Sequence, residues 1–182
     1  MNIPNAITAV RFVLIPFFGY FLYMGQFDSS QYIVAVIIFL IGGFTDVLDG
    51  FIARKFNLIT SFGKLADPIA DKLMQITALV ILTIQDKIPV VVLIIVIAKE
   101  AFMGTGSILL YRQENLVVSA NWYGKLATVV FHIAIIIAIF SANKSYSDIF
   151  IAIAVCATLF AFFMYSMTYR KIKSSTNTNK PG

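Results

Sequence analysis

The sequence predicts an all-α integral membrane protein, a bundle of six transmembrane helices with a short interfacial segment at the N-terminus. Of the 182 residues, 59% are hydrophobic and only 13% are charged, whereas soluble domains are about 45–50% apolar and about 25% charged. Apolar stretches of about 20 residues, the length of a membrane-spanning helix, follow one another with short connectors. Lipid offers the backbone no hydrogen-bond partner, so these stretches are expected to be helical.

The helices can be placed from the apolar stretches and the residues that flank them. The amphipathic opening, residues 2–11, is expected to lie in the membrane interface. Pro68 is expected to mark the start of the third helix, because proline suits a first helical turn, and Gly63 to bend the preceding link. Trp122 is typical of an anchor at the membrane–water boundary. The transmembrane helices are expected at residues 8–24, 31–54, 66–85, 88–112, 122–141 and 146–169.

The chain is expected to contain one domain. Residues 1–170 form this membrane domain, since the length suits a single compact unit. Residues 171–182 are polar and are expected to be a disordered tail. The N-terminus lacks a Lys-rich start and a small-residue cleavage site, so we expect it to be part of the structure.

The distribution of Lys and Arg predicts the orientation, because cytoplasmic loops carry the excess of basic residues. With the N-terminus inside, only Lys87 and Lys144 fall in outer loops. We therefore expect a multi-pass protein of the cytoplasmic (inner) cell membrane, with both termini inside. The net charge of +5 favours anionic membrane lipids as partners rather than nucleic acid. The residues predicted to be cytoplasmic are Arg11, Arg54, Lys55, Lys64, Arg112, Lys125, Arg170, Lys171, Lys173 and Lys180.

Four aspartates interrupt this apolar sequence: Asp46, Asp49, Asp67 and Asp71. Each carboxylate near the centre of a bilayer costs about 2.5–3.5 kcal/mol. Together they approach the stability of an ordinary domain, roughly 5–15 kcal/mol. Ion pairing, hydration of a cytoplasmic cavity or a bound cation could offset this cost.

The spacing of the aspartates favours a bound cation. Asp46, Asp49, Gly50 and Ala53 share one face of a helix, where two carboxylates lie beside residues with almost no side chain. Asp67 and Asp71, four residues apart, form a second carboxylate face on the next helix, and basic residues flank the link. Solvent-exposed aspartates at a helix end would explain one or two of the four, but not the small residues between them.

Hard oxygen ligands in this number suit Mg²⁺, Mn²⁺ or Ca²⁺, and no Cys/His set suggests zinc. Carboxylates, a hard cation and Arg or Lys side chains are together typical of phosphoryl transfer. A cation transporter or channel is an alternative, but an ion path needs polar residues across the whole membrane. The aspartates cluster towards one side of it.

The motif resembles the signature of the CDP-alcohol phosphatidyltransferases. It reads Asp46-x-x-Asp49-Gly50-x-x-Ala53-Arg54, then eight residues, then Gly63-x-x-x-Asp67-x-x-x-Asp71, without a gap or substitution. The resemblance also covers the six-helix length, and so nearly the whole chain. It implies transfer of the phosphatidyl group from CDP-diacylglycerol to an alcohol, with release of CMP.

The resemblance implies roles for the motif residues. Asp71 would be the general base that accepts the proton of the acceptor hydroxyl. One or two divalent ions, Mg²⁺ or Mn²⁺, would be held by Asp46, Asp49, Asp67 and Asp71. The CDP-diacylglycerol site would be formed by Asp46, Asp49, Gly50, Ala53, Arg54, Gly63 and Asp67. A homodimer is also implied.

The acceptor is predicted from further segments. "NIPNAITAVR", "DPIADK" and "YGKLAT" are similar to the subfamily that uses sn-glycerol 3-phosphate. The phosphate of that acceptor calls for additional cations, for which Arg11, Lys64, Arg112 and Lys125 are candidates. Asn5 and Thr8 could help to close the site. A related branch, cardiolipin synthase, uses phosphatidylglycerol as the alcohol and is the alternative within the family.

Two charged residues of the fourth apolar stretch depart from that subfamily, which usually has Arg-Glu where this chain has Lys99-Glu100. Lysine does not replace arginine at a bidentate site. Adjacent residues do not share a helix face, so each of the two is expected to need its own partner. His132 is expected to be a hydrogen-bonded histidine of the membrane core rather than a catalytic group.

Overall fold

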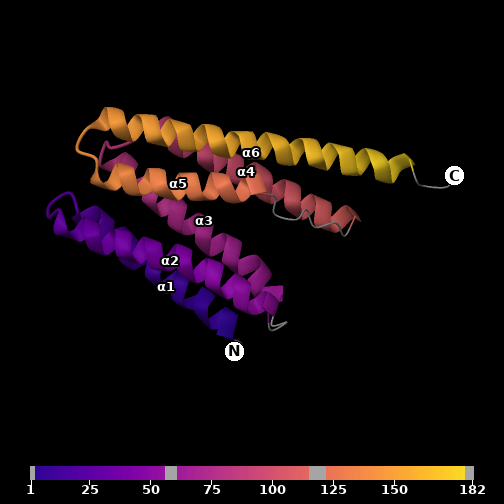
Figure 1. Ribbon diagram of the computed structural model, residues 1–182, viewed down its shortest axis with the longest axis horizontal. Coiled ribbons are helices and arrows are strands. Elements are labelled where there is room, and N and C mark those ends of the chain that lie inside the picture. Colours follow the sequence, from indigo (N-terminus) through magenta and orange to yellow (C-terminus); the bar gives the residue numbers. More distant parts are fainter. Residues whose placement is uncertain (1–2, 56–60, 115–121, 179–182) are drawn as a thin grey trace. The chain divides into compact units, whose positions relative to one another are not determined.

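The computed structural model describes the backbone of residues 3–55, 61–114 and 122–178, and this part of the chain forms six helices (Figure 1). Side chains are described for residues 6–45, 48, 55, 66–105 and 122–167. The prediction of an all-α protein is confirmed. The helices are α1 (Ile3–Met24), α2 (Ser30–Lys55), α3 (Ser61–Ile84), α4 (Val90–Glu114), α5 (Trp122–Phe140) and α6 (Lys144–Thr178).

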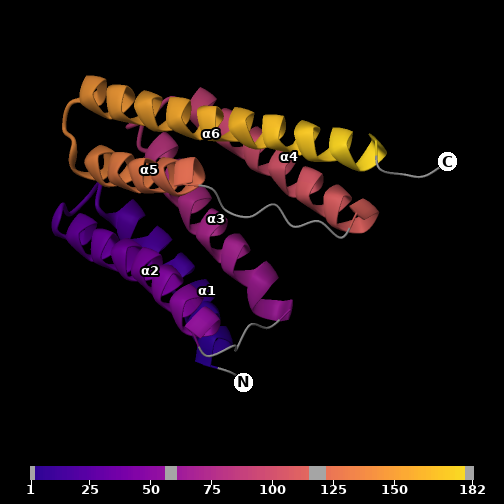
Figure 2. The same ribbon diagram turned by 45° about the vertical axis from the view of Figure 1, so that its right-hand side comes forward.

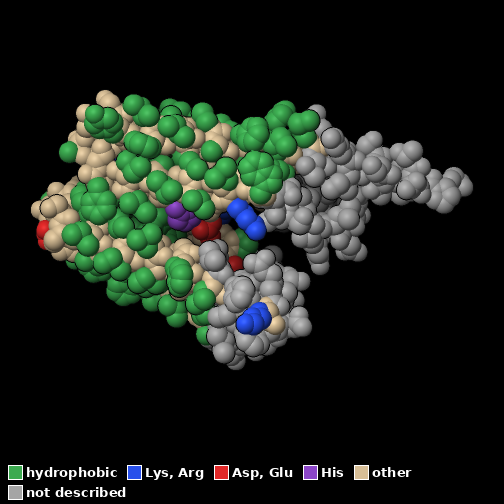
Figure 3. Space-filling model, in the orientation of Figure 1, with side chains coloured by type: hydrophobic (Ala, Val, Ile, Leu, Met, Phe, Trp, Pro, Cys, Tyr) green, Lys and Arg blue, Asp and Glu red, His purple; other side chains and the backbone are tan. Residues whose placement is uncertain are grey.

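The helices present apolar side chains to their surroundings, as a membrane protein requires. Figure 3 shows hydrophobic side chains over much of the described surface on one face. Large apolar residues such as Phe17, Phe102 and Phe163 are more than half exposed, which in water would be an unusual surface. Three described segments are long and apolar enough to cross a membrane: Ala6–Met24, Trp122–Phe140 and Lys144–Met167.

The chain divides into two compact units. The first comprises residues 1–88 with 139–142, and therefore holds α1, α2 and α3. Within it α1 packs along both α2 and α3, and α1 and α2 lie side by side in both ribbon views (Figures 1 and 2). Phe18 of α1 stacks on Phe39 of α2 with 5.3 Å between ring centroids. Both rings are fully buried, so apolar packing holds this pair of helices.

Side-chain hydrogen bonds tie the helices of the first unit together where α1 and α3 end and α2 begins. Gln85 donates to the carbonyl oxygen of Leu22 at 2.8 Å, and its own side-chain oxygen accepts from the Tyr32 hydroxyl at 3.3 Å. The Lys87 ammonium lies 4.2 Å from the centre of the Tyr32 ring and donates to the carbonyl oxygen of Ile139. Burial at this loop position lowers the pKa of Lys87. The cluster therefore joins four chain segments through paired polar groups.

The start of α2 is capped by Asp28, which lies two residues before Ser30 in the connecting loop. One carboxylate oxygen of Asp28 accepts from the backbone N–H of Ser30 at 3.0 Å. The other accepts from the Ser30 hydroxyl and from the Gln31 side chain. These hydrogen bonds, the one from Gln31 first, lower the pKa of Asp28. A capping carboxylate satisfies backbone donors that have no partner within the helix.

Substitution of Gly25 by alanine is expected to destabilise the first unit. A Cβ atom at Gly25 would overlap the ring of Tyr32, which is buried and cannot swing aside. Overpacking of this kind costs about 1–3 kcal/mol, a fall in Tm of roughly 2–12 °C for a chain of this size. Thermal unfolding in detergent, followed by circular dichroism, measures the effect.

Gly104→Ala is the matched control, because a Cβ atom there meets nothing within 4 Å. Alanine is also the better helix former by about 1 kcal/mol, so the Tm of this variant should equal or exceed that of the wild type. Equal Tm values for Gly25→Ala and wild type would contradict the close packing against Tyr32.

The second unit comprises residues 89–138 with 143–182, and so holds α4, most of α5 and α6. Within it α4 packs on α6, where the rings of Phe102 and Phe162 meet edge to face at 5.5 Å. Tyr123 and Ala127 of α5 are buried against Ala161 of α6. Ala127 and Ala161 are the small residues of this cluster, and small residues are common where membrane helices pack.

Three details of the helices differ from the sequence prediction. Pro68 lies inside α3, because this helix begins at Ser61, before the predicted boundary. The opening residues continue into α1 as one helix from Ile3, although Pro16 lies within it. Helix α6 continues through residues 171–178, where a disordered tail was expected. Extending an existing helix avoids the cost of nucleation, which explains why a polar sequence continues it. The extent of the membrane domain, residues 1–170, stays a prediction.

Candidate active site

The predicted aspartate motif lies on two helices of the first unit. Asp46 and Asp49 belong to the C-terminal part of α2, while Asp67 and Asp71 belong to α3, and α2 contacts α3. Asp67 and Asp71 are one helical turn apart and therefore share a face of α3. The motif and acceptor residues whose side chains fall outside the described part are Asp46, Asp49, Gly50, Ala53, Arg54, Gly63, Lys64 and Arg112.

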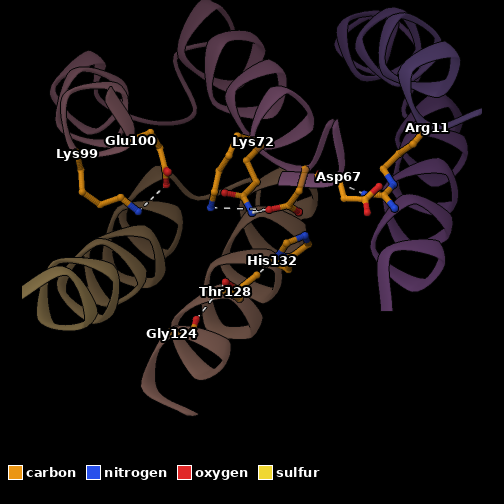
Figure 4. Close-up of polar contacts among 10 residues, drawn as sticks. Arg11, Asp67, Lys72, Lys99, Glu100, Gly124, Thr128 and His132 are labelled. Atoms are coloured by element: carbon orange, nitrogen blue, oxygen red, sulfur yellow. Dashed lines mark hydrogen bonds and ion pairs between the residues drawn. The ribbon is translucent and has the colours of Figure 1, made fainter. Parts of the chain in front are cut away.

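The carboxylate of Asp67 is held from α1. The hydroxyl of Thr8 donates a hydrogen bond to Oδ1 of Asp67 at 2.5 Å. One turn further along α1, a terminal nitrogen of Arg11 lies 3.5 Å from the backbone carbonyl oxygen of Asp67 (Figure 4). Thr8 is 0% exposed and Arg11 1% exposed, so these polar side chains are directed into the first unit. Both residues were predicted to lie near the site.

Asp71 has two polar neighbours on its own helix. Gln75 donates from its side-chain nitrogen to Oδ2 of Asp71 at 3.1 Å, and it is only 4% exposed. The ammonium of Lys72 lies 3.8 Å from the same oxygen. No role was predicted for Gln75, although a Gln four residues from an Asp on a helix is a known hydrogen-bonding pair and could have revealed it. The carboxylate therefore lies in a polar setting within α3.

The residues fit a hard divalent cation by the chemistry of their donors. Asp67 and Asp71 offer carboxylate oxygens, which Mg²⁺ and Mn²⁺ prefer. Among the side chains that the structure describes, no three potential ligands gather in one place. Asp46 and Asp49, which were predicted to complete the set, lie outside that part. The donor types on α3 are thus compatible with the predicted site.

The predicted acceptor residues are found on several elements. Arg11 is buried on α1 beside Asp67. Lys125 is exposed on α5 in the second unit. Lys64 and Arg112 belong to α3 and α4. Their contacts with an acceptor stay predictions.

Lys99 and Glu100 pair with each other, whereas a separate partner for each was predicted. The ammonium of Lys99 lies 2.5 Å from Oε1 of Glu100 (Figure 4). Their Cβ atoms point about 100° apart around the helix, but both side chains are long and flexible enough to meet beside it. The two side chains are 10% and 16% exposed, so the ion pair is largely shielded.

His132 forms the expected hydrogen bond within α5, and its side chain is half-buried. Its Nδ1 lies 2.8 Å from the carbonyl oxygen of Thr128, one turn earlier (Figure 4). A carbonyl oxygen only accepts, so Nδ1 carries the proton of this hydrogen bond. The hydroxyl of Thr128 in turn donates to the carbonyl oxygen of Gly124 at 3.1 Å.

Several known proteins are similar to this chain in sequence. The protein from Bacillus subtilis (strain 168) named CDP-diacylglycerol–glycerol-3-phosphate 3-phosphatidyltransferase is 39% identical over 138 residues, which cover 70% of each chain. The protein of the same name from Haemophilus influenzae is 37% identical over 136 residues, which cover 70% of this chain and 69% of the relative. A probable phosphatidylglycerophosphate synthase from Mycobacterium tuberculosis (strain H37Rv) is 36% identical over 135 residues, 74% of this chain and 64% of the relative.

The family comparison covers most of the sequence. The model of the CDP-alcohol phosphatidyltransferases matches residues 1–163 of the 182, and so includes the whole aspartate motif. With a match of this extent and relatives above 30% identity over more than two thirds of the chain, the chain belongs to the CDP-alcohol phosphatidyltransferase family.

Proposed function

We propose that the protein transfers the phosphatidyl group from CDP-diacylglycerol to sn-glycerol 3-phosphate and releases CMP. The observation that carries this proposal is the aspartate motif on α2 and α3 within a chain 39% identical to a relative named for this reaction. The product is phosphatidylglycerophosphate, a membrane lipid. An apolar helical protein gives such a reaction access to its lipid substrate.

The reaction breaks a phosphoanhydride bond of the pyrophosphate and forms a phosphate ester bond to the acceptor. A hydroxyl oxygen of glycerol 3-phosphate attacks the phosphorus atom that carries the diacylglycerol, and the bond from that phosphorus to the oxygen of CMP breaks. Asp71 accepts the proton of the attacking hydroxyl, as a general base positioned by the hydrogen bond from Gln75. Lys72, 3.8 Å from the same carboxylate, adds positive charge beside it.

The motif residues bind the nucleotide end of the substrate. One or two Mg²⁺ or Mn²⁺ ions, held by Asp46, Asp49, Asp67 and Asp71, would neutralise negative charge on the pyrophosphate. Gly50 and Ala53 have little or no side chain, so the backbone of α2 leaves room for a ligand. The CDP-diacylglycerol site comprises Asp46, Asp49, Gly50, Ala53, Arg54, Gly63 and Asp67.

The acceptor differs from a simple alcohol because it carries a phosphate. Arg11, Lys64, Arg112 and Lys125 are the basic residues proposed to recognise it. Arg11 is supported by its position beside Asp67, at the end of α1 that contacts the motif. The six helices are proposed to cross the cytoplasmic membrane with the motif and both termini inside, and the protein to form a homodimer.

Two other functions compete with this one. A cardiolipin synthase of the same family would use phosphatidylglycerol as the alcohol and keep the same aspartate chemistry. A cation transporter or channel would need polar groups along a path across the membrane. The motif instead lies at adjoining ends of α2 and α3, and the match to a transferase family speaks for an enzyme.

An acceptor screen tests the proposal. Purified protein in detergent is supplied with CDP-diacylglycerol and Mg²⁺ or Mn²⁺, and with glycerol 3-phosphate, phosphatidylglycerol, serine or inositol in turn. CMP release and the lipid product are followed by mass. We expect turnover with glycerol 3-phosphate and loss of turnover when the cation is chelated.

Two other results of the acceptor screen would support a different function. Turnover only with phosphatidylglycerol would assign the protein to the cardiolipin branch. Absence of CMP release with every acceptor, together with cation flux into liposomes, would support a transporter instead.

A further inference from the structure

Thr8 makes an unusual contact for a threonine in this protein. The hydroxyls of Thr45, Thr83 and Thr105 each donate to a carbonyl oxygen of the preceding turn in their own helix. The Thr8 hydroxyl reaches from α1 to α3, where it donates to Oδ1 of Asp67. Thr8 is 0% exposed, and the loss of a hydrogen bond in such a position carries a large penalty. The contact is therefore a fixed feature of the packing between α1 and α3.

Asp67 is a residue that needs support from outside its helix. It precedes Pro68 within α3, and proline disfavours the helical conformation of the residue before it. Proline also has no N–H, so one hydrogen bond of the helix is missing nearby. Arg11 donates to the backbone carbonyl oxygen of Asp67, and Thr8 to its side chain. Helix α1 thus holds both the backbone and the carboxylate of this residue.

The contact leaves one carboxylate oxygen available. Thr8 occupies Oδ1, and Oδ2 of Asp67 accepts no hydrogen bond from the side chains and backbone that the structure describes. A hydrogen bond to one carboxylate oxygen restricts the rotation of the whole group. It therefore also fixes the direction in which the second oxygen, Oδ2, points. Groups that hydrogen-bond to a metal ligand typically change metal affinity by about 10–100-fold when removed.

We propose that Thr8 is a positioning residue that orients the carboxylate of Asp67 for the divalent cation. This inference rests on the proposed function, in which Asp67 is a cation ligand. In this proposal Thr8 acts through its hydrogen bond to Oδ1 and not as a ligand of the cation. The first helix is then part of the machinery of the site, although none of the eight motif residues belongs to it.

Two substitutions distinguish the effect of the Thr8 hydroxyl from the effect of the side-chain shape: Thr8→Val and Thr8→Ser. Valine has the shape of threonine without the donor, whereas serine keeps the donor. The dissociation constant for Mn²⁺ is measured on the full-length protein in detergent, without substrate, from the electron paramagnetic resonance signal of free Mn²⁺. We expect Thr8→Val to raise this constant about 10–100-fold and Thr8→Ser to stay within about threefold of wild type.

The Mn²⁺ dependence of CMP release provides a second measurement. The Mn²⁺ concentration for half-maximal CMP release should rise by the same factor in Thr8→Val, while kcat at saturating Mn²⁺ changes much less. Thr83→Val is the control, because the Thr83 hydroxyl bonds only within α3, to Leu79, at 2.7 Å. Its Mn²⁺ affinity should equal that of the wild type.

The outcomes test the proposed function and the role of Thr8 separately. A wild-type protein that neither binds Mn²⁺ nor releases CMP contradicts the proposed function. A functional wild type with an unchanged Mn²⁺ constant in Thr8→Val overturns the role of Thr8 alone. Equal losses in Thr8→Val and Thr8→Ser would also overturn it, because the hydroxyl would then not be the cause. If thermal unfolding shows that Thr8→Val does not fold, Thr8→Ala compared with Thr8→Ser provides the same contrast.

Discussion

Replacement of Asp71 by asparagine is expected to abolish CMP release while CDP-diacylglycerol still binds. Asparagine has the size of aspartate, and its amide oxygen can still accept the hydrogen bond that Gln75 donates to Oδ2. It cannot take up the proton of the acceptor hydroxyl. General-base catalysis contributes about 10²–10⁴-fold, so kcat should fall by that factor. CMP release under saturating substrates measures kcat, and binding of CDP-diacylglycerol is measured separately by its protection against thermal unfolding.

The Mn²⁺ constant of Asp71→Asn distinguishes its two possible contributions. If Asp71 is a base that does not contact the cation, the substitution leaves the Mn²⁺ dissociation constant unchanged. If Asp71 is also a cation ligand, the substitution raises this constant. Asp28→Asn is the matched control, since Asp28 caps α2 in an exposed loop and asparagine caps equally well. Normal turnover in Asp71→Asn would remove the assignment of Asp71 as the base.

Replacement of Asp67 by alanine is the second change with a large expected effect. It removes a predicted cation ligand and leaves the hydroxyl of Thr8, which is 0% exposed, without its acceptor on α3. A cation at a phosphoryl group contributes several kcal/mol of charge stabilisation, and 1.4 kcal/mol corresponds to about tenfold in rate. The value of kcat/KM should therefore fall on the order of 10³-fold, with a matching loss of Mn²⁺ affinity.

A second variant distinguishes a loss of cation binding from a loss of stability. The Tm of Asp67→Ala in detergent is compared with that of Asp67→Asn, which keeps an acceptor for Thr8 but loses the charge. Both variants should lose activity, and Asp67→Asn should lose less stability. Retention of wild-type Mn²⁺ affinity in both variants would contradict the role of Asp67 as a ligand.

Much of the fold was predictable because apolar stretches of membrane length locate helices directly. Helix α5 was predicted at 122–141 and found at Trp122–Phe140, and the other ends agree less closely. Helix α3 begins earlier than predicted, at Ser61. The sequence rule for proline treats it as a boundary, but contacts of α1 with Asp67 support the helix through Pro68.

Residue spacing predicted which site residues share a face of the same helix, but it did not predict the contacts between helices. The i and i+4 positions of Asp67 and Asp71 determine their common face, and the same rule would have found Gln75 beside Asp71. The bond from Thr8 to Asp67 joins residues 59 positions apart. Such a contact depends on how α1 packs against α3, and no local pattern encodes it. Likewise, the pairing of Lys99 with Glu100 depends on the reach of two flexible side chains rather than on helical periodicity.

That ion pair has an electrical consequence for α4. In the proposed arrangement, α4 crosses a membrane that carries a voltage, and the energy of a net charge depends on its position in that voltage. A charge carried through the full potential changes in energy by about 2.3 kcal/mol per 100 mV, but a Lys–Glu pair carried together contributes nothing. Replacing Glu100 or Lys99 alone would leave one net charge within the helix. In the proposed arrangement, the paired side chains therefore leave this part of α4 without a net charge on which the voltage could act.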